Sequence, residues 1–322
     1  MSRKLASLCV LAPASMFRQQ EIGNKDLSTV VTRHKLIKRI KDEKFDEEKL
    51  HGYVLLTQIG AKDFQTAVID SEDSRLLFFE DYVFSDVNSQ EDLIAALKIL
   101  FESHEYLTAG FWKEVRVSIK NNKFAQVPGA LFLEDAAAEY LTFNAALDDQ
   151  KEAARTCRNK LSDAVTVYAV QLEMLAWMEK MYVNTKVNYV HQSAALIEGV
   201  LAQASSRQSI PLYVYVDRFK LHILFVKNGK LIYYNQFLIK QFSDYVKYIM
   251  LVMNAMGLNQ ETSPVVLWGY IGKNSPHYQE FVKYVRNVSF GDRPTHIKFG
   301  YLFDEVQDHH FFDLFSTYLL TA

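Results

Sequence analysis

Short apolar runs separated by tight polar turns occur twice along the chain. The segment LYVYVDRFKLHILFVKNGKLIYYNQF (212–237) holds three such runs, separated by DRFK and KNGK. The second turn contains Asn228-Gly229, a strong signal for a two-residue hairpin loop. An earlier segment, YVLLTQIGAKDFQTAVIDSEDSRLLFFEDYVF (53–84), has the same pattern. Each segment therefore predicts three antiparallel strands: 53–59, 63–70 and 75–84 in the first, and 212–217, 219–227 and 230–238 in the second.

The elements that follow each strand triplet occur in the same order. Ser89 is a fair N-cap for a helix that ends at about His104. After this helix, the pattern predicts a strand at 114–120, a helix at 171–182, a strand at 186–190 and a helix at 192–204. After the second triplet, it predicts a helix at 241–256, a strand at 264–269, a helix at 275–287, a strand at 296–303 and a helix at 309–319. Both halves therefore read β-β-β-α-β-α-β-α.

This repeated order predicts an α/β protein with two lobes. Each lobe is expected to contain a five-stranded mixed sheet with strand order 3-2-1-4-5, flanked by helices. Residues 52–206 are assigned to the first lobe and residues 207–322 to the second. Residues 121–163 interrupt the first lobe as an insertion with a Pro-Gly turn and an acidic helix, and a buried strand is expected at 164–170.

The first part of the chain, residues 1–51, stands outside the repeat as an N-terminal arm. Residues 20–50 are polar and charged, which favours a loosely attached arm or a surface helix. Residues 1–19 combine a basic start with a short apolar stretch broken by Pro13, a poor match to a signal peptide. We expect these residues to be poorly packed, so their deletion should leave the thermal midpoint of unfolding nearly unchanged.

Charge and cysteine usage exclude several classes of protein. The 36 Lys and Arg residues are balanced by 38 Asp and Glu residues, so no global field attracts nucleic acid or anionic lipid. Cys9 and Cys157 form neither a disulfide framework nor a zinc site. No apolar run approaches the length of a membrane span. The sequence therefore predicts a cytoplasmic protein with no nucleic-acid partner and no membrane span.

Three stretches resemble a known family. They are LTAGFWKEVRVSIKNNKFAQVPGALFLEDAAAEYLTFN (107–144), NYVHQSAALIEG (188–199) and VYVDRFKLHILFVKNGKLIYYNQF (214–237). They are similar to the Bacteroidetes family of uncharacterised proteins known as domain of unknown function 3822, over about residues 45–320. The resemblance implies a duplicated actin-like (ribonuclease H-like) ATPase fold, akin to the cytoplasmic actin-like proteins of pilus and type II secretion assembly. It implies no established activity.

The resemblance also directs attention to the nucleotide motifs of actin-like ATPases, where Asp-x-Gly in each first turn holds phosphate and Mg²⁺. Here the corresponding residues are Gln58-Ile59-Gly60 and Asp217-Arg218-Phe219, so each turn has lost a different half of the motif. The Gly-Gly pair expected near the adenosine is Gly269-Tyr270. Gly60, Asp217 and Gly269 therefore mark a vestigial nucleotide cleft, and we expect no cofactor and no ATP turnover.

Two functions remain open from these residues. The first is a non-catalytic actin-like scaffold or protein-interaction protein, with degenerate nucleotide motifs and a protein partner. The alternative is a nucleotide-binding actin-like ATPase or switch in an assembly machine, with ATP as cofactor. Asp217 would then be the surviving carboxylate, and Gly60 and Gly269 would supply backbone contacts. An open polar cleft favours the alternative, whereas a cleft filled by Phe219 and Tyr270 favours the scaffold.

The remaining chemical signals have simpler interpretations. Asp304, Asp308, His309, His310 and Asp313 are the densest group of potential metal ligands, but they lack the i, i+4 histidine pair of a zinc helix. We therefore expect no metal. His191 is interpreted as a cap at a strand-to-helix turn. The segment GYIGKNS (269–275) lacks the spacing of a phosphate-binding loop and is interpreted as a plain turn.

Overall fold

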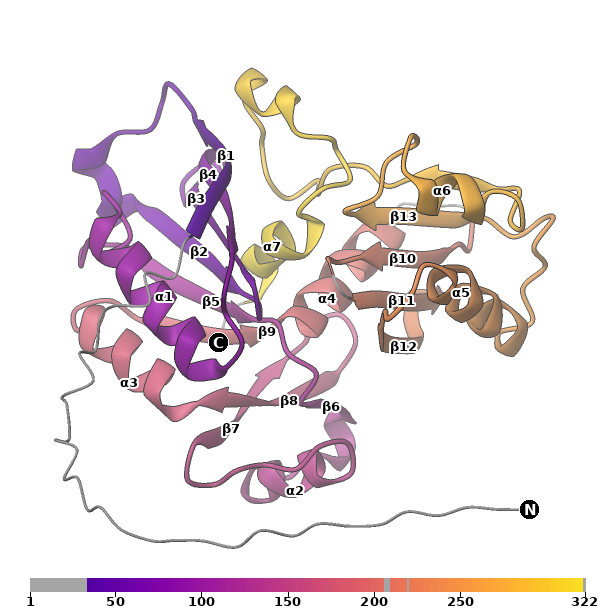
Figure 1. Cartoon of the computed structure of the whole chain (residues 1–322), viewed down its shortest axis with the longest axis horizontal. Coiled ribbons are helices and arrows are strands. Elements are labelled where there is room, and N and C mark those ends of the chain that lie inside the picture. Colours follow the sequence, from indigo (N-terminus) through magenta and orange to yellow (C-terminus); the bar gives the residue numbers. More distant parts are fainter. Residues whose placement is uncertain (1–33, 206–208, 219, 321–322) are drawn as a thin grey trace, which may run out of the picture. The chain divides into compact units, whose positions relative to one another are not determined.

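The computed structural model describes residues 34–205, 209–218 and 220–320 (Figure 1). The expectations for residues 1–33 and for Phe219 concern positions outside these ranges. Within them, two mixed β-sheets and one small antiparallel sheet are flanked by helices, which confirms the predicted α/β class. No helix in these ranges is both long and apolar enough to cross a lipid bilayer.

The first sheet has six strands in the order β1-β4-β3-β2-β5-β9. They are β1 (His34–Lys41), β2 (Tyr53–Ile59), β3 (Asp63–Asp70), β4 (Leu76–Phe84), β5 (Glu114–Ile119) and β9 (Val187–His191). The central strand, β2, pairs antiparallel with β3 and parallel with β5. The strand order 3-2-1-4-5 predicted for five strands is therefore confirmed, and β1 is an additional strand.

β1 corrects the expectation that residues 20–50 form a loose arm or a surface helix. It pairs antiparallel with β4, from His34 opposite Phe84 to Lys41 opposite Phe78. Its one buried side chain, Ile40, enters the core on one face of the sheet. Lysine-rich strands are common at sheet edges, where charge discourages pairing with other chains. The charge that suggested an arm therefore belongs to an edge strand. A short 3₁₀ helix, η1 (Glu47–Gly52), leads from β1 to β2.

Helices from distant parts of the chain cover the two faces of the first sheet (Figure 1). α1 (Gln90–Ser103) and α3 (Leu172–Met181) pack on the face to which Leu55 points. α7 (Phe312–Ser316) packs on the opposite face, to which Val54 points. Successive side chains of a strand point to opposite faces, so a strand buried on both faces is apolar nearly throughout. β2 is buried at every position for this reason.

The insertion forms a small sheet of its own. β6 (Phe124–Pro128), β7 (Glu152–Arg158) and β8 (Ala164–Gln171) pair in the order β6-β8-β7. Two short 3₁₀ helices, η2 (Gly129–Leu131) and η3 (Glu134–Ala136), precede α2 (Ala137–Thr142), which packs on this sheet. Because β8 pairs with β6 and β7, the insertion extends to the end of β8 and not only to residue 163.

The second sheet has five strands in the order β12-β11-β10-β13-β14, which confirms the predicted order. They are β10 (Leu212–Val216), β11 (Lys220–Lys227), β12 (Lys230–Leu238), β13 (Val265–Gly269) and β14 (Val288–Phe290). α5 (Ser243–Ala255) and α6 (Pro276–Phe281) cover one face of this sheet. α4 (Gln192–Ala204) covers the other face.

The last part of the chain differs from the prediction in two elements. The final strand is β14, whereas the strand predicted at 296–303 forms only one bridge, from Lys298 to Arg75, before the 3₁₀ helix η4 (Tyr301–Glu305). Ile297 and Phe303 are buried because this segment packs irregularly against the first sheet, which produced a strand-like pattern. The helix predicted at 309–319 is α7 followed by the 3₁₀ turn η5 (Thr317–Leu319).

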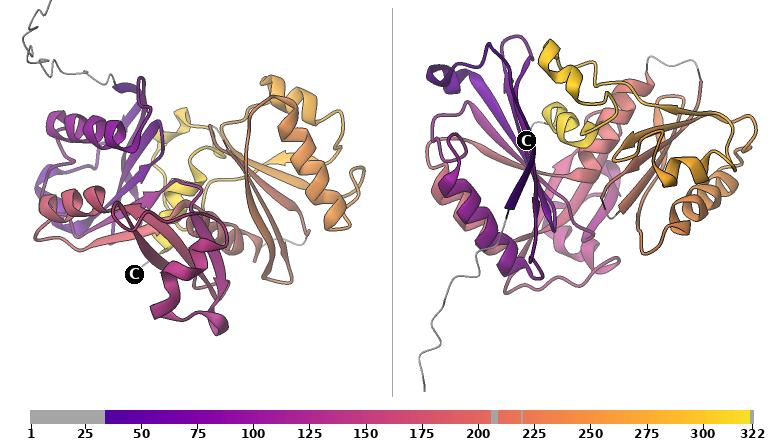
Figure 2. Two further views of the ribbon diagram at one scale, coloured as in Figure 1. Left: turned by 60° about the horizontal axis from the view of Figure 1, so that its bottom comes forward. Right: turned by 45° about the horizontal axis from the view of Figure 1, so that its top comes forward.

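α4 and α7 pack against each other between the two sheets (Figures 1 and 2). α4 follows β9 of the first sheet but buries Leu196 and Val200 against the second sheet. α7 follows the second sheet but buries Leu314 against the first. At Gly199 a Cβ atom would lie 2.1 Å from Ser316 Oγ, so only glycine permits this close approach of the helices. Each sheet is therefore completed by a helix that follows the other sheet in the chain.

Candidate functional site

The first turns of the two sheets are built alike. The Gly60 amide donates a hydrogen bond to the Asp63 carbonyl oxygen at 2.9 Å, and the Asp217 amide donates to the Lys220 carbonyl oxygen at 2.9 Å. The first bond closes the β2–β3 turn and the second closes the β10–β11 turn. Gly60 and Asp217 therefore occupy equivalent positions, as do Asp63 and Lys220.

The strand beside each turn extends this equivalence. The Lys120 amide donates to the Ile59 carbonyl oxygen at 2.9 Å, and the Tyr270 amide donates to the Val216 carbonyl oxygen at 2.7 Å. Lys120 directly follows β5 and Tyr270 directly follows β13, each a parallel neighbour of the strand that enters the turn. The carboxyl ends of these strands carry the candidate site, as is usual where parallel strands end in an α/β sheet.

This register corrects the predicted correspondence of Gln58 with Asp217. Gln58 lies two residues before Gly60, so its equivalent is Tyr215, two residues before Asp217. Gln58 Nε2 donates to Ser118 Oγ at 3.3 Å. The Tyr215 hydroxyl donates to the buried carboxylate of Asp313. Neither strand end therefore carries a carboxylate at this position.

A buried ion-pair network joins the two turns. Lys120 Nζ lies 2.8 Å from Asp63 Oδ2 and 2.9 Å from Asp217 Oδ1, and all three side chains are buried. Burial alone would lower the pKa of Lys120, but Asp217 and Asp63 outweigh it and hold that pKa well above its ordinary value. Burial would likewise raise the pKa of Asp217, but Lys120 outweighs it and holds that pKa below its ordinary value. The pair is therefore fully charged at neutral pH.

Arg218 continues the network toward β4. Its Nη2 lies 2.6 Å from one carboxylate oxygen of Asp81 and 2.8 Å from the other. The guanidinium carbon lies 4.5 Å from the ring centroid of Tyr270, whose hydroxyl accepts a hydrogen bond from Arg218 at 3.1 Å. Gln65 Nε2 also donates to the Tyr270 hydroxyl, at 3.2 Å. Tyr270 therefore bonds to β3 of the first sheet, through Gln65, and to the β10–β11 turn, through Arg218.

The three residues predicted for the vestigial cleft separate into two groups. Gly60 and Asp217 line the same cavity at the junction of the turns. Gly269 is not among the described residues that line it. Gly269 has φ +90°, and a Cβ atom there would lie 2.1 Å from the Val216 carbonyl oxygen. Close approach of the β10 backbone therefore requires glycine at this position, whatever binds nearby.

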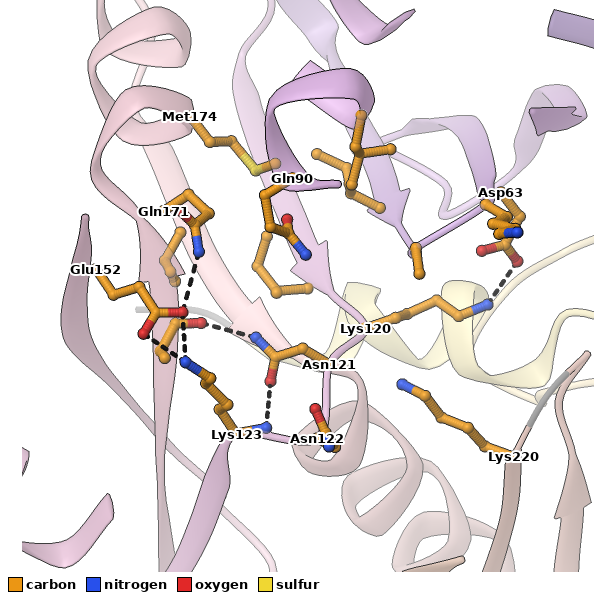
Figure 3. Close-up of a pocket in the computed structure, with 18 of the residues that line it drawn as sticks. Asp63, Gln90, Lys120, Asn121, Asn122, Lys123, Glu152, Gln171, Met174 and Lys220 are labelled. Carbon is orange, nitrogen blue, oxygen red and sulfur yellow. Dashed lines mark hydrogen bonds and ion pairs between the residues drawn. The ribbon is translucent and has the colours of Figure 1, made fainter. Parts of the chain in front are cut away.

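The cavity has a volume of about 570 Å³ and lies beside the ion-pair network (Figure 3). Its walls come from the ends of β2 and β5, the start of α1, the end of β8, the start of α3 and the β10–β11 turn. Lys123, Glu152 and Gln171 are bonded to one another along one wall: Lys123 Nζ lies 2.6 Å from Glu152, and Gln171 Nε2 donates to Glu152 at 3.0 Å.

The other signals of the sequence have structural roles. Among the described residues, no three His, Cys, Asp or Glu side chains are grouped to hold a metal ion. Asp304 and Asp308 both pair with Arg293, whereas Asp313 accepts a hydrogen bond from Gln192 at 2.7 Å. His191 is the N-cap of α4 and accepts a hydrogen bond from the Ser193 amide, which confirms its predicted capping role.

Sequence reasoning missed the cations at this junction. Lys120, Arg218 and Lys220 each lie at the end or the start of a strand, where charged residues are usually solvated. In the sequence, these cations are marked only by their positions next to strand ends, and parallel pairing brings such strand ends together. That signal could have placed Lys120 beside the first turn, but it could not identify Asp63 and Asp217 as its partners.

The two mixed sheets and the site at their strand ends define an actin-like fold, and comparison with known proteins supports this class. A protein with actin-like ATPase fold and unknown function from Bacteroides thetaiotaomicron is 21% identical, covers 77% of this chain and 93% of its own, and superposes with a TM-score of 0.69. A chain of the PilM-PilN type IV pilus biogenesis complex is 12% identical, with 83% and 97% covered and a TM-score of 0.56.

The chain belongs to the family described as "Protein of unknown function (DUF3822)", whose sequence model matches residues 42–288. The family predicted from the three quoted stretches is therefore confirmed. No match was found among curated proteins.

Proposed function

We propose that this protein is a non-catalytic actin-like scaffold that binds a protein partner and does not use nucleotide. The observation that carries the proposal is the position of Lys120, between a carboxylate of the first turn and a carboxylate of the second. In actin-like ATPases these two turns hold phosphate and its metal ion. Here an ammonium group of the protein itself neutralises the carboxylates that face each other across the junction.

A metal ion at this junction would have to displace Lys120. Asp217 is the carboxylate of the second turn, and Lys120 outweighs the effect of burial and holds the pKa of Asp217 low. The Lys120 ammonium lies 2.9 Å from Asp217. A divalent cation bound to Asp217 would therefore lie close to this buried ammonium, and the two positive charges would repel each other strongly. Occupation by Lys120 therefore disfavours the Mg²⁺ that phosphoryl transfer requires.

The equivalent positions Gln58 and Tyr215 also support the proposal. Neither side chain is anionic at neutral pH, so neither strand end offers the carboxylate that organises metal and water in an actin-like ATPase. The Tyr270 ring, held under the Arg218 guanidinium, takes a place that glycine leaves open in the adenosine-side motif. At three elements of a nucleotide site this chain therefore has side chains that bond to other groups of the protein: Gln58 to Ser118, Tyr215 to Asp313, and Tyr270 to Arg218 and Gln65.

A protein partner is suggested by one structural neighbour. The chain with a TM-score of 0.56 comes from the PilM-PilN type IV pilus biogenesis complex, so an actin-like fold in that assembly takes part in a protein complex. We extend that general role, partner binding by an actin-like fold, to this chain. The identity of the partner does not follow from the likeness.

Calorimetric titration with Mg-ATP, together with a phosphate-release assay, tests the proposal on the full chain. We expect no heat of binding at millimolar nucleotide and no phosphate release above that of buffer. Partner retention by the immobilised chain should be the same in Mg-ATP as in EDTA. Micromolar binding of Mg-ATP, with turnover that is lost in Asp217→Ala, would instead establish the nucleotide-dependent switch or ATPase.

A further inference from the structure

We propose that the cavity beside the turn junction binds a small organic anion with an aliphatic body, whose carboxylate or phosphate group pairs with Lys220. This ligand would need neither a nucleoside nor a metal ion. The inference is therefore independent of whether the scaffold proposal holds.

The charges around the cavity leave a cation without a partner. Four lysines and three carboxylates line it: Lys62, Lys120, Lys123, Lys220, Asp63, Glu152 and Asp217. Lys120 pairs with Asp63 and Asp217, and Lys123 pairs with Glu152. Lys62 is exposed. The lining therefore carries one more positive charge than negative charges, which suits a ligand with a single negative charge.

Lys220 is the cation that faces the cavity. Its ammonium group points into the space between Lys120 and Asn122 (Figure 3). Among residues 34–205, 209–218 and 220–320, no ion pair or hydrogen bond joins another side chain to Lys220 Nζ. Burial lowers the pKa of this amine to about 8, although the negative charge of Asp217 acts to raise it. Burial of this amine thus carries a cost that a bound anion would remove.

The rest of the cavity is suited to an aliphatic body. Apolar side chains of β2, β5, β8, β12, α1 and α3 line it. They are Ile59, Ile119, Val170, Leu238, Leu93 and Met174. A volume of about 570 Å³ is within the range of small-molecule sites. Gln90 and Leu238 are exposed, so a ligand can enter between the start of α1 and the end of β12. A half-buried cation beside an apolar wall fits an amphipathic anion.

Binding of a matched ligand series to the full chain tests this inference by calorimetry. The probes are octanoate, octyl phosphate, octanol, octylammonium and acetate, each below its aggregation concentration. We expect octanoate or octyl phosphate to bind about tenfold or more tightly than octanol, because one charge-assisted hydrogen bond contributes about 1.5–3 kcal/mol. Acetate should bind about 100-fold or more weakly than octanoate, because each buried methylene contributes about 0.8 kcal/mol. Octylammonium should not bind. The preference between octanoate and octyl phosphate identifies the head group.

Lys220→Met and Lys227→Met form a matched pair on the same strand. Lys227 is exposed at the far end of β11. We expect Lys220→Met to weaken octanoate binding by about tenfold or more and Lys227→Met to leave it unchanged. Two results with the wild-type chain alone would overturn the inference: equal affinity for octanol and octanoate, or no binding of any alkyl probe. Unchanged octanoate affinity in a folded Lys220→Met would overturn it too. Binding of Mg-ATP would contradict the scaffold proposal alone.

Discussion

Lys120 and Asp217 belong to different sheets, yet each is buried and each depends on the other for its charge. An ion removed from water loses several kcal/mol of solvation, and its partner restores this only when the geometry is good. Here one ammonium serves two carboxylates, at 2.8 and 2.9 Å. Removal of one member therefore leaves buried charge without compensation, which costs far more than the loss of a surface pair.

Replacement of Lys120 by methionine tests this interdependence. We expect Lys120→Met to lower the free energy of unfolding by about 3–5 kcal/mol, because Asp217 would remain buried without its cation and Asp63 would keep only the more distant Arg218, at 3.6 Å. Lys98→Met is the control, since Lys98 pairs with Glu173 at an exposed position, where such pairs contribute about 0–1 kcal/mol. Urea denaturation followed by circular dichroism measures both. Equal effects of the two variants would show that the network does not stabilise the fold.

The pH dependence of stability follows from Asp217 and from His222, a buried residue of β11. Burial lowers the pKa of His222 to about 3, so between pH 6.5 and about pH 3 the unfolded chain binds a proton that the folded chain excludes. The pKa of Asp217 is held below the ordinary aspartate pKa of about 4. The stability that this carboxylate contributes is therefore lost as the pH falls below about 4. Both effects make the free energy of unfolding decrease as the pH is lowered from 6.5 to about 3.

Urea denaturation at stepped pH checks this expectation. The free energy of unfolding should decrease continuously from pH 6.5 downward. The slope between about pH 6 and pH 5 should be smaller in His222→Gln, because that variant binds no proton at this position in either state. A stability that stays constant over this range in the wild-type chain would contradict the assignment of His222 as buried and neutral.

Part of the site could be predicted from residues alone. Gly60 and Asp217 were placed correctly at the two turns because strand ends and turn residues are legible in sequence. Their relative register was not, because only the hydrogen bonds at 2.9 Å show that Gly60, and not Gln58, is equivalent to Asp217. Lys120 was missed because a lysine after a strand is indistinguishable from a solvated one until its partners across the molecule are known.

At the scale of elements, the pairing of α4 with α7 depends on a single residue, Gly199. Gly199 brings the two helices together, and a Cβ atom there would lie 2.1 Å from Ser316 Oγ and 2.9 Å from the Phe312 ring. Glycine is a poor helix former and costs about 1 kcal/mol relative to alanine in a helix interior. Close packing, and not helix propensity, therefore determines the residue at this position.

Gly199→Leu should separate these two effects. We expect it to lower the free energy of unfolding by about 1–3 kcal/mol or more through overpacking, despite the better helix propensity of leucine. Ala202→Leu, three residues further along α4 at a partly exposed position, is the matched control and should have little effect. Thermal and urea denaturation measure both variants. A stabilised Gly199→Leu would show that α4 and α7 can separate without cost.

The elements that local pattern predicts well are those whose burial is regular. Ser89 caps α1 as expected: its hydroxyl oxygen accepts from the Asp92 amide, and the Asp92 carboxylate accepts from the Ser89 amide. The strands of both hairpin triplets also lie where apolar runs placed them. The errors occurred where burial was one-sided or irregular. β1 has one buried side chain in eight residues, and residues 296–303 bury Ile297 and Phe303 without pairing as a strand. Neither case has a period that sequence can reveal.

At the scale of the whole described chain, the two sheets share their cores through the helices that lie between them. The face of the first sheet that contains Val54 and Ile69 is covered by Phe311, Leu314 and Phe315. The face of the second sheet that contains Tyr213 and Tyr215 is covered by α4. Each sheet therefore lacks part of its own core when the helix that follows the other sheet is taken away.

Fragments test this dependence. We expect residues 34–205 produced alone to bind a hydrophobic dye and to unfold without a cooperative transition, because one face of the first sheet would be exposed. Addition of a peptide with residues 303–320 should restore part of the cooperativity. Differential scanning calorimetry and dye fluorescence measure both outcomes. A cooperative transition of the fragment alone, without dye binding, would show that the first half is an independent domain.

The position of α7 in the chain also sets the order of events during synthesis. The sheet face around Val54 and Ile69 emerges from the ribosome early, but its cover is not made until residue 315 has been added. Throughout that interval a broad apolar surface lacks its native partner, and such surfaces are the ones that chaperones retain and that nascent chains aggregate through. Slowing translation between the codons of β3 and those of α7 should therefore lower the soluble yield, whereas the same slowing before β2 has been translated should not.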